Sequence, residues 1–469
     1  MLVYQPYNRV PISDVALDDA ASIQTKLERA NRAFADRSNW IPAYKRIEIL
    51  RRIAYLVEQE HEQFALRIAR EGGKPLADAR VEVKRAINGV QIAASTVERM
   101  VGEEIPMGLT PASKDRWAFT TKEPIGVVVA ISAFNHPLNL IVHQVMPAIA
   151  TGCPVIIKPA PTTPLSCIRL VELIGEAGLS EPWCQTVVLD DVALAESLAT
   201  DQRVAFLSFI GSARVGWSLR SKLAPGTRCA LEHGGAAPVI VDRSANIEAV
   251  IGPLVKGGYY HAGQVCVSVQ RIFVHEDVKQ QFVESFTDSV SRLKVGDPTQ
   301  LDTEVGPLIL PGEVDRVETW VQEAMDHSGV VTTGGARIGN TAYRPTVILE
   351  PPPDVRVSQQ EIFGPITCVY GYTELPDAIA RANSLPVAFQ ASLFTRDINV
   401  ALTAAKLLDA STVLINDHSA FRTDWMPFAG RRQSGLGTGG IPYTMYDMTL
   451  DKMVVFNFQD PFVELGTPS

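Results

Sequence analysis

Three short segments combine residue types suited to covalent catalysis and phosphate binding. Cys266 ends the turn Gly263-Gln264-Val265-Cys266, where converging backbone amides can lower the pKa of a thiol and favour the nucleophilic thiolate. Glu232 ends an apolar run and precedes Gly234-Gly235, two glycines that let other groups approach closely. The turn Gly211 to Gly216 follows another apolar run, and the N–H groups of such a turn can bind a phosphate. Taken singly, each segment is more often structural.

The elements that must position these segments alternate between helices and buried strands. Apolar residues recur at spacings of three and four from Ile23 to Glu98, which predicts successive amphipathic helices, one of which ends at Gly72-Gly73. Apolar, β-branched runs then alternate with helical patterns up to Asp417, which predicts two doubly wound α/β units. Within this region, residues 231–242 are predicted as one strand. The Gly- and Pro-rich segment 418–447 is predicted as a long irregular loop of functional importance.

Composition and charge exclude several classes of protein. The 469 residues are 46% hydrophobic and 20% charged, which is typical of a globular protein and not of a disordered chain. A net charge of −9 gives no electrostatic reason to expect a nucleic-acid partner. The N-terminal segment lacks a signal pattern and no apolar run is long enough to span a membrane, so no membrane partner and a cytoplasmic location are expected. Six cysteines without a CxxC pair predict reduced thiols and no metal site.

Eight segments resemble motifs of the aldehyde dehydrogenase superfamily, in the same order and along nearly the whole chain. This resemblance implies the NAD(P)-dependent oxidation of an aldehyde, on a fold with a Rossmann-like cofactor domain, a catalytic domain and a small β extension. The matching segments are Glu123-Pro124-Ile125-Gly126-Val127-Val128, Phe134-Asn135-His136-Pro137, Lys158-Pro159-Ala160, Phe209-Ile210-Gly211-Ser212 with Gly216, Glu232-His233-Gly234-Gly235, Gly263-Gln264-Val265-Cys266, Glu361-Ile362-Phe363-Gly364-Pro365, and Met426-Pro427-Phe428-Ala429-Gly430 with Ser434-Gly435.

The resemblance implies three catalytic residues. Cys266 matches the nucleophile that attacks the aldehyde carbon, and Asn135 matches the side chain that stabilises the resulting oxyanion together with the Cys266 N–H. Glu232 matches the general base that activates water to hydrolyse the thioester. Two alternatives stay open: a relative that transfers the acyl group to coenzyme A, and a catalytically silent structural or binding protein. The presence of Glu232 favours hydrolysis.

The same resemblance implies a dinucleotide site. Pro161 occupies a place where many NAD-preferring relatives have a Glu that repels a 2′-phosphate, so NADP is admitted and the choice between NAD and NADP stays open. The implied cofactor residues are Lys158 at the adenosine ribose, Ser212 at the pyrophosphate, Glu361 at the nicotinamide ribose, Phe363 beside the nicotinamide, and Ala160, Gly211 and Gly216 around them.

Polar residues occupy places that relatives acting on apolar aldehydes fill with aromatic side chains. Arg422 lies in the late loop, Arg85 lies on a helix that faces the channel in relatives, and His136 and His143 follow the oxyanion Asn. A guanidinium group suits a carboxylate, phosphate, phosphonate or sulfonate, so we expect a small anionic aldehyde, such as a semialdehyde or a phospho- or phosphonoaldehyde. The resemblance is to a semialdehyde, lactaldehyde or phosphonoaldehyde branch of the superfamily. Alternatively, Arg422 fixes the loop by pairing with Asp424, and the histidines bind neighbouring backbone groups.

The resemblance also implies a division of the chain. The expected extension normally pairs between subunits, since its open strand edges are a liability in a monomer, so a homodimer or homotetramer is expected. The expected parts are residues 1–102 and 123–232 for the cofactor domain, with 418–447 returning to it, 233–417 for the catalytic domain, and 103–122 with 448–469 for the oligomerisation extension.

Overall fold

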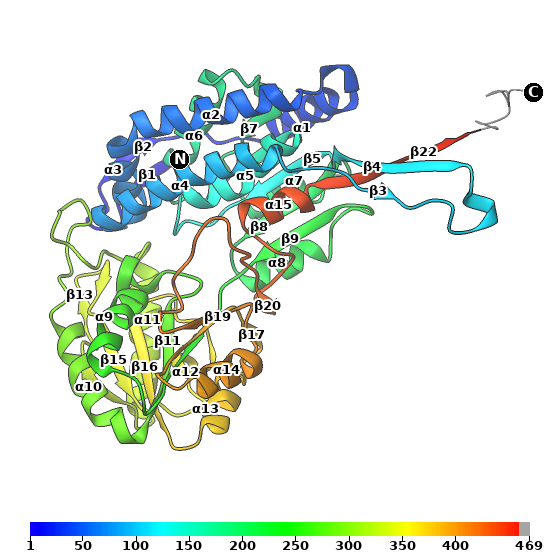
Figure 1. The fold of residues 1–469 in the computed structure, drawn as a ribbon. Coiled ribbons are helices and arrows are strands. Elements are labelled where there is room, and N and C mark those ends of the chain that lie inside the picture. Colours follow the sequence, from blue (N-terminus) through cyan, green and yellow to red (C-terminus); the bar gives the residue numbers. More distant parts are fainter. Residues whose placement is uncertain (459–469) are drawn as a thin grey trace, which may run out of the picture.

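The computed structural model describes residues 1–458, and these form two α/β units and a projecting arm (Figure 1). The first unit contains a six-stranded sheet of order β21-β9-β8-β5-β6-β7, and the second a seven-stranded sheet of order β12-β15-β16-β11-β10-β18-β19. Most neighbouring strands in both sheets run parallel, as expected where helices connect them. The predicted α/β class is confirmed. None of the helices within residues 1–458 combines the length and apolar character needed to cross a bilayer.

The first sheet is buried on both faces. Alternate residues of β5 pack to opposite sides of the sheet. Val128 and Ala130 belong to the core under helices α4 (Leu76–Val97) and α5 (Asn139–Thr151), whereas Val127 and Val129 belong to the core under α1 (Ala20–Ala35). Burial on both sides explains the unbroken apolar run of this strand. The strands are β5 (Val127–Ile131), β6 (Val155–Lys158), β7 (Cys184–Thr186), β8 (Val204–Ile210), β9 (Arg228–Glu232) and β21 (Gly435–Leu436).

Helices of the N-terminal segment cover this sheet as predicted, and α3 ends at Gly72. The longest of them, α4, is buried along one face between α2, α3 and α5. The helices are α1 (Ala20–Ala35), α2 (Ala43–Gln59), α3 (His61–Gly72), α4 (Leu76–Val97), α5 (Asn139–Thr151), α6 (Leu165–Glu176), α7 (Val192–Ala199), α8 (Ala213–Arg220) and α15 (Ile441–Asp447).

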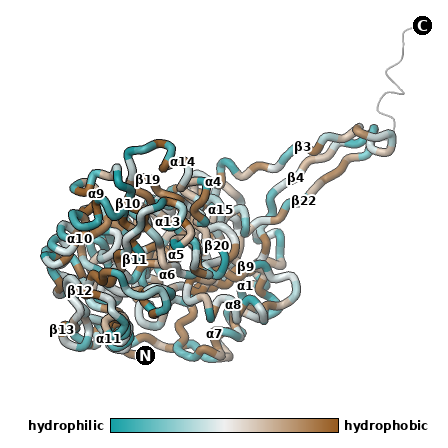
Figure 2. Tube along the Cα trace, turned by 90° about the horizontal axis from the view of Figure 1, so that it is seen from below, coloured by the Kyte–Doolittle hydropathy of each residue, from teal (hydrophilic) through white to brown (hydrophobic). Residues whose placement is uncertain are grey.

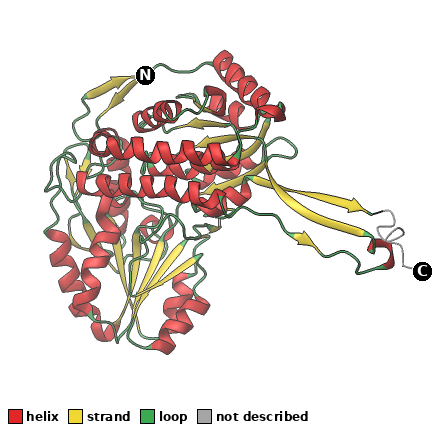
Figure 3. Ribbon diagram, turned by 45° about the horizontal axis from the view of Figure 1, so that its top comes forward, coloured by secondary structure: helices red, strands yellow, loops and turns green. Residues whose placement is uncertain are grey.

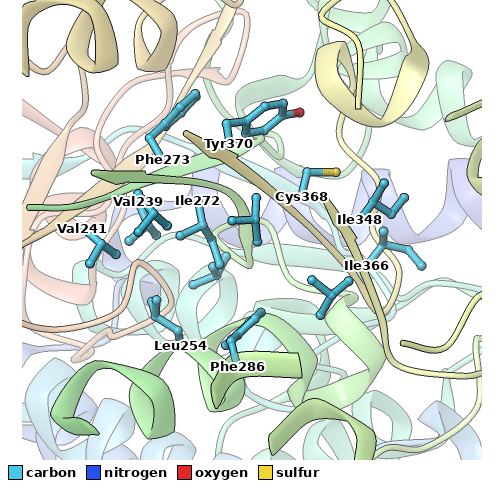
Figure 4. Close-up of a cluster of buried hydrophobic side chains, with 14 of the residues drawn as sticks. Val239, Val241, Leu254, Ile272, Phe273, Phe286, Ile348, Ile366, Cys368 and Tyr370 are labelled. Atoms are coloured by element: carbon cyan, nitrogen blue, oxygen red, sulfur yellow. The ribbon is translucent and has the colours of Figure 1, made fainter. Parts of the chain in front are cut away.

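The second unit has its own core, in which Val239, Ile272 and Cys368 of the sheet pack with Leu254 and Phe286 of the helices (Figure 4). Its strands are β10 (Ala237–Val241), β11 (Val269–His275), β12 (Val330–Thr333), β15 (Thr346–Leu349), β16 (Ile366–Tyr372), β18 (Gln390–Phe394) and β19 (Thr412–Ile415). Its helices are α9 (Ile247–Tyr259), α10 (Glu276–Ser291), α11 (Pro311–Asp326), α12 (Arg356–Gln359), α13 (Leu375–Ala382) and α14 (Ile398–Leu407).

The prediction of one strand over residues 231–242 was wrong. The chain leaves the first sheet after β9, crosses in four residues and enters the second sheet as β10. The glycines of this crossing permit close packing, since a Cβ on Gly234 would lie 1.7 Å from the Glu361 carboxylate. The crossing places Glu232 at the boundary between the two units.

The arm is a three-stranded antiparallel sheet that extends from the body (Figure 3). Its strands are β3 (Glu104–Ile105), β4 (Arg116–Pro124) and β22 (Thr449–Asn457). The register of β22 on β4 runs from Thr449 opposite Pro124 to Asn457 opposite Arg116. Apolar stretches lie along it (Figure 2), and the rings of Trp117 and Phe456 stack with centroids 5.8 Å apart. The part of the predicted extension beyond residue 458 lies outside the described residues.

The predicted loop 418–447 is irregular over most of its length, but its last seven residues form helix α15, which packs on α5. Pro442 suits the first turn of this helix, which explains why a Pro- and Gly-rich segment can still end in a helix. The remaining short elements are β1 (Leu2–Tyr4), β2 (Pro11–Asp14), β13 (Arg337–Ile338), β14 (Ala342–Tyr343), β17 (Val387–Ala388), β20 (Arg431–Arg432), and the 3₁₀ helices η1 (Arg37–Asn39), η2 (Pro111–Ser113), η3 (Glu181–Trp183) and η4 (Tyr260–Gly263).

Candidate active site

A cavity of about 540 Å³ lies between the two units, and residues from both of them line it. The first unit contributes residues at or just beyond the carboxyl ends of its parallel strands, where ligands of such sheets normally bind. The second unit contributes the segment around Cys266. The candidate residues in the wall are Arg85, Asn135, His136, Ala160, Gly211, Ser212, Glu232, Cys266, Glu361, Phe363 and Arg422.

Cys266 follows η4, in which His261 and Ala262 have left-handed backbone angles (φ 51° and 55°). This strained turn carries the thiol to the cavity wall. Burial raises the pKa of the Cys266 thiol to about 12, the Glu232 carboxylate adds to the rise, and the Arg422 guanidinium opposes it. The turn amides therefore do not dominate the pKa, contrary to the expectation from sequence.

Glu232 ends β9 and faces the same cavity. Burial raises the pKa of its carboxyl group above the ordinary value, whereas the charge of Arg422 lowers it. Its Oε1 lies 3.8 Å from Arg422 Nη1 and has no hydrogen-bond partner within residues 1–458. A carboxylate with a raised pKa and a free oxygen suits a general base.

Asn135 lies in the loop after β5 and is buried. Its Nδ2 donates a hydrogen bond of 2.9 Å to the backbone oxygen of Gln264, two positions before Cys266. Gln264 is itself held, since its Oε1 accepts from the Ile309 N–H at 2.9 Å. An amide nitrogen carries two N–H groups, so the second is available to an oxyanion beside Cys266.

Arg422 is buried in the cavity wall, with 10% of its side chain exposed. Its guanidinium carbon lies 3.5 Å from the centre of the Phe428 ring. One nitrogen, Nη2, lies 3.3 Å from Nδ1 of His143. Within the described chain, Nε of Arg422 has no hydrogen-bond partner, so the guanidinium retains donors for a ligand.

Asp424 does not pair with Arg422 but with Arg85, which lies on α4. The two hydrogen bonds of this pair measure 2.7 and 3.2 Å. The same carboxylate accepts from Asn139 at 3.0 Å and contacts Nε2 of His143 at 2.8 Å. Burial alone would raise its pKa, but the His143 hydrogen bond and the Arg85 charge hold the pKa of Asp424 well below its usual range. Asp424 is thus a buried anion that joins three side chains.

The two candidate histidines occupy different places. His136 lines the cavity, and burial lowers its pKa well below the ordinary value. His143 lies behind Arg422, outside the lining of the cavity, and burial together with the Arg422 charge lowers its pKa to about 4. A neutral His143 whose Nε2–H donates to Asp424 has a lone pair on Nδ1, which can accept from Arg422. His143 therefore links Asp424 to Arg422.

Five of the seven residues expected at the cofactor line the cavity: Ala160, Gly211, Ser212, Glu361 and Phe363. Burial raises the pKa of Glu361 to about 8, and its Oε1 is without a partner in the described part of the chain. Ser212 precedes α8 and its hydroxyl does not cap that helix, so it is available to a phosphate. Phe363 meets Phe134 edge to face, with centroids 5.8 Å apart. These free polar atoms and the apolar ring fit a dinucleotide.

Lys158 and Gly216 lie near this region without lining the cavity. Lys158 ends β6, is buried, and its Nζ donates to the Pro159 carbonyl at 3.2 Å. Gly216 contacts His233, because a Cβ there would lie 2.0 Å from the ring. His233, for which the sequence suggested no role, packs between Phe209 and Trp217. Its Nδ1 lies 2.9 Å from the Gly211 carbonyl and fixes the glycine turn.

The described residues contain neither a disulfide bond nor a group of side chains suited to bind a metal ion. All six cysteines are free thiols. In the described range 1–458, no group of three or more His, Cys, Asp or Glu residues is arranged to hold a metal ion.

Comparison with known proteins identifies the family. The model of the aldehyde dehydrogenase family matches residues 1–454, and the chain belongs to this family. It is therefore an oxidoreductase that acts on aldehydes with NAD(P)⁺. A 3-sulfolactaldehyde dehydrogenase of Priestia megaterium is 36% identical over 457 residues, covering 97% of this chain and 95% of the relative.

Two solved structures show the same fold. Aldehyde dehydrogenase 21 from Physcomitrella patens, in complex with the reaction product succinate, matches with a TM-score of 0.94 and 34% identity, covering 97% of this chain and 95% of that one. A glyceraldehyde-3-phosphate dehydrogenase from Methanocaldococcus jannaschii, complexed with NADP, matches with a TM-score of 0.93 and 34% identity, covering 98% and 99%. These matches confirm the predicted fold class and NAD(P) as the cofactor, without resolving NAD from NADP.

Proposed function

We propose that this enzyme oxidises a small aldehyde carrying an anionic group, such as a sulfonate, carboxylate, phosphate or phosphonate, to the free carboxylic acid. One observation carries the proposal: Arg422 is a buried cation in the wall of the cavity that contains Cys266, and no carboxylate hydrogen-bonds to it within residues 1–458. The charge of Arg85, by contrast, is neutralised by Asp424. A guanidinium in a buried wall whose nearest carboxylate, Glu232, lies 3.8 Å away without a hydrogen bond can still bind an anionic ligand.

The names of three of the similar proteins support an anionic substrate. 3-Sulfolactaldehyde, succinate and glyceraldehyde 3-phosphate each combine a short carbon chain with a sulfonate, carboxylate or phosphate. We take 3-sulfolactaldehyde as the test substrate and lactaldehyde as its neutral counterpart, because the two differ by the sulfonate alone. Arg422 would bind the sulfonate of the substrate. His136 and Arg85, which also line the cavity, would lie around the substrate hydroxyl group.

In the proposed mechanism, the Cys266 thiol gives its proton to water as its sulfur bonds to the aldehyde carbon. The carbonyl electron pair moves to the oxygen, to which the Asn135 side chain and the Cys266 N–H donate hydrogen bonds. When bound, NAD(P)⁺ would supply the acceptor for the hydride that leaves the aldehyde carbon as the thioester forms at Cys266. Glu232 then takes a proton from water as the water oxygen bonds to the acyl carbon. The C–S bond breaks, and the electron pair returns to Cys266. The shared cavity of these three residues supports the assignment.

We propose that the cofactor lies along the part of the cavity that contains Ala160, Gly211, Ser212, Glu361 and Phe363. The Ser212 hydroxyl and the glycine turn would hold the pyrophosphate, and the free Glu361 oxygen would bind the nicotinamide ribose. The first α/β unit would then be the cofactor domain and the second the catalytic domain, as the division at residue 232 predicts.

The test is cofactor reduction by the purified enzyme with NAD⁺ and NADP⁺ separately. We expect 3-sulfolactaldehyde to have a kcat/KM at least about tenfold above that of lactaldehyde, since a charged hydrogen bond contributes ~1.5–3 kcal/mol. Arg422→Gln should remove the difference. Equal kcat/KM values for the two aldehydes would overturn the proposed substrate class.

The fate of the acyl group is a separate question. Glu232 at the cavity supports transfer to water, whereas the alternative transfers the acyl group to coenzyme A. Analysis of the product with and without coenzyme A separates them. Free acid in both reactions supports hydrolysis, and an acyl-coenzyme A product would overturn it.

A further inference from the structure

Arg422 contacts two parts of the site at once. Its guanidinium faces the cavity, and its Nη1 lies 3.8 Å from Oε1 of Glu232. Both side chains are largely buried, with 10% and 15% exposed. A charge pair that is screened little by solvent interacts strongly, so an ion that binds to Arg422 must change the pKa of Glu232.

Arg422 is also the charge that offsets the effect of burial on Glu232. Burial raises the pKa of Glu232, and the guanidinium of Arg422 lowers it. The contact is an ion pair without a hydrogen bond, since Glu232 Oε1 has no hydrogen-bond partner in the described residues. The charge of Arg422 therefore lowers the pKa of Glu232 without a hydrogen bond between them. An anion bound to Arg422 can cancel this effect, which we call the release of Glu232.

We propose that the anionic group of the substrate takes over Arg422 and thereby releases Glu232 to act as the general base. This inference rests on the proposed function, in which Arg422 binds that group. An anion on the guanidinium cancels most of its field at Glu232, which restores the basicity that burial gives the carboxylate. The same group that selects the substrate thus activates the residue that hydrolyses its acyl-enzyme.

The step that this release controls is deacylation. The water oxygen bonds to the acyl carbon, one water proton passes to Glu232, and the C–S bond breaks with its electron pair going to Cys266. With a neutral acyl group, Arg422 still holds Glu232, so water is activated poorly and the thioester accumulates. With an anionic acyl group, the sulfonate or carboxylate remains on Arg422 and Glu232 is free.

Aryl esters isolate this step, because they acylate Cys266 directly and need no cofactor. We choose p-nitrophenyl 3-sulfopropanoate and p-nitrophenyl 3-(methylsulfonyl)propanoate, whose acyl groups have nearly the same shape and differ in charge. The burst of p-nitrophenolate reports acylation, the later linear rate reports deacylation, and mass spectrometry of acid-quenched enzyme reports the thioester. In the wild-type enzyme we expect the anionic acyl group to leave severalfold faster, because relief of the pKa-lowering effect of Arg422 makes Glu232 a stronger base.

Two variants of Arg422 test the origin of the difference. In Arg422→Gln, which removes the cation, the neutral acyl group should leave faster than from the wild-type enzyme, and the two acyl groups should leave at similar rates. Arg422→Lys keeps a cation and should retain the difference. The wild-type comparison between the two esters remains decisive even if a variant folds poorly.

The outcomes separate this inference from the proposed function. Equal deacylation rates for the two esters in the wild-type enzyme would overturn the release of Glu232, even where 3-sulfolactaldehyde keeps its higher kcat/KM and the proposed substrate class stands. A deacylation rate of the neutral ester that does not rise in Arg422→Gln would also overturn it. Loss of the kcat/KM preference between aldehydes would instead overturn the proposed function.

Discussion

Arg85, which lines the cavity that contains Cys266, forms a two-point ion pair with Asp424, 339 positions later in the chain. Asp424 is 2% exposed and the Arg85 side chain is 25% exposed, so the pair joins α4 of the first unit to the late loop in a largely buried environment. This pairing neutralises Arg85 through hydrogen bonds, whereas the carboxylate of Glu232 lies 3.8 Å from Arg422 without a hydrogen bond, so Arg422 keeps donors for a ligand. The assignment of a substrate role to Arg422 depends on this division of charges.

Replacing Asp424 with Asn should destabilise the protein and weaken substrate binding. The change leaves Arg85 as a buried cation without its anion, which costs about 3–5 kcal/mol when one partner of a buried pair is removed. Urea unfolding measures the loss in stability, and KM for 3-sulfolactaldehyde should rise. Glu62→Gln, which breaks the exposed Arg80–Glu62 pair, is the matched control and should have little effect. Equal stabilities of the two variants would contradict the structural role of Asp424.

His143 should act as a positioning residue for Arg422. In His143→Phe the ring volume is kept but the acceptor for Arg422 is lost. We expect KM for 3-sulfolactaldehyde to rise roughly tenfold with little change in kcat, the effect of one hydrogen bond to a charged group. In His143→Gln the amide can both donate to Asp424 and accept from Arg422, so KM should recover. Lactaldehyde kinetics, which lack the anion, should be unaffected, and equal effects on both aldehydes would argue for general disruption.

The fold and the reacting groups were predictable because they depend on local patterns. Continuous apolar runs indicate strands buried on both faces, and ordered short motifs carry Cys266, Glu232 and Asn135, all three of which line one cavity. The break between β9 and β10 was not predictable from the pattern, since residues 231–242 are apolar at both ends. The segment is divided because β9 pairs with β8 in the first sheet, whereas β10 pairs with β11 in the second.

The electrostatics of the site depend on contacts between distant segments. Asp424 lies two positions from Arg422, so the sequence alone favoured a local pair, and nothing local indicates that α4 supplies Arg85 instead. Likewise, the turn around Cys266 suggested a lowered thiol pKa, whereas burial and Glu232 raise it. The predicted domain boundaries, site roles and subunit pairing stay predictions.

The arm should mediate subunit association, as the resemblance predicts. Trp117 and Phe456 stack on it and remain about half exposed, and such apolar surface favours burial against a second copy. The double change Trp117→Ser and Phe456→Ser should shift a dimer or tetramer toward smaller species in light scattering. Tyr44→Ser, at an exposed tyrosine on α2, serves as the control. A wild-type monomer, or an unchanged assembly in the double variant, would contradict this role.

The pH dependence of deacylation should identify Glu232 as the base. The base acts in its deprotonated form, and burial raises the pKa of Glu232, so the rate should fall on acidification at a higher pH than an ordinary carboxylate would give. The cofactor-free aryl ester assay measures this acid limb of the pH–rate profile without interference from hydride transfer. With the anionic acyl group, which relieves the pKa-lowering effect of Arg422, the limb should move to still higher pH than with the neutral one.

Two variants assign that limb to a residue. Glu232→Gln should lower the deacylation rate by about 10²–10⁴ and abolish the acid limb, while the initial burst persists because acylation does not need this carboxylate. Glu361 is the appropriate control, since burial raises its pKa to about 8 and it lies in the same cavity. Glu361→Gln should leave the limb in place. A limb that survives in Glu232→Gln but disappears in Glu361→Gln would move the general base to Glu361, and the ion pair with Arg422 would then have no part in hydrolysis.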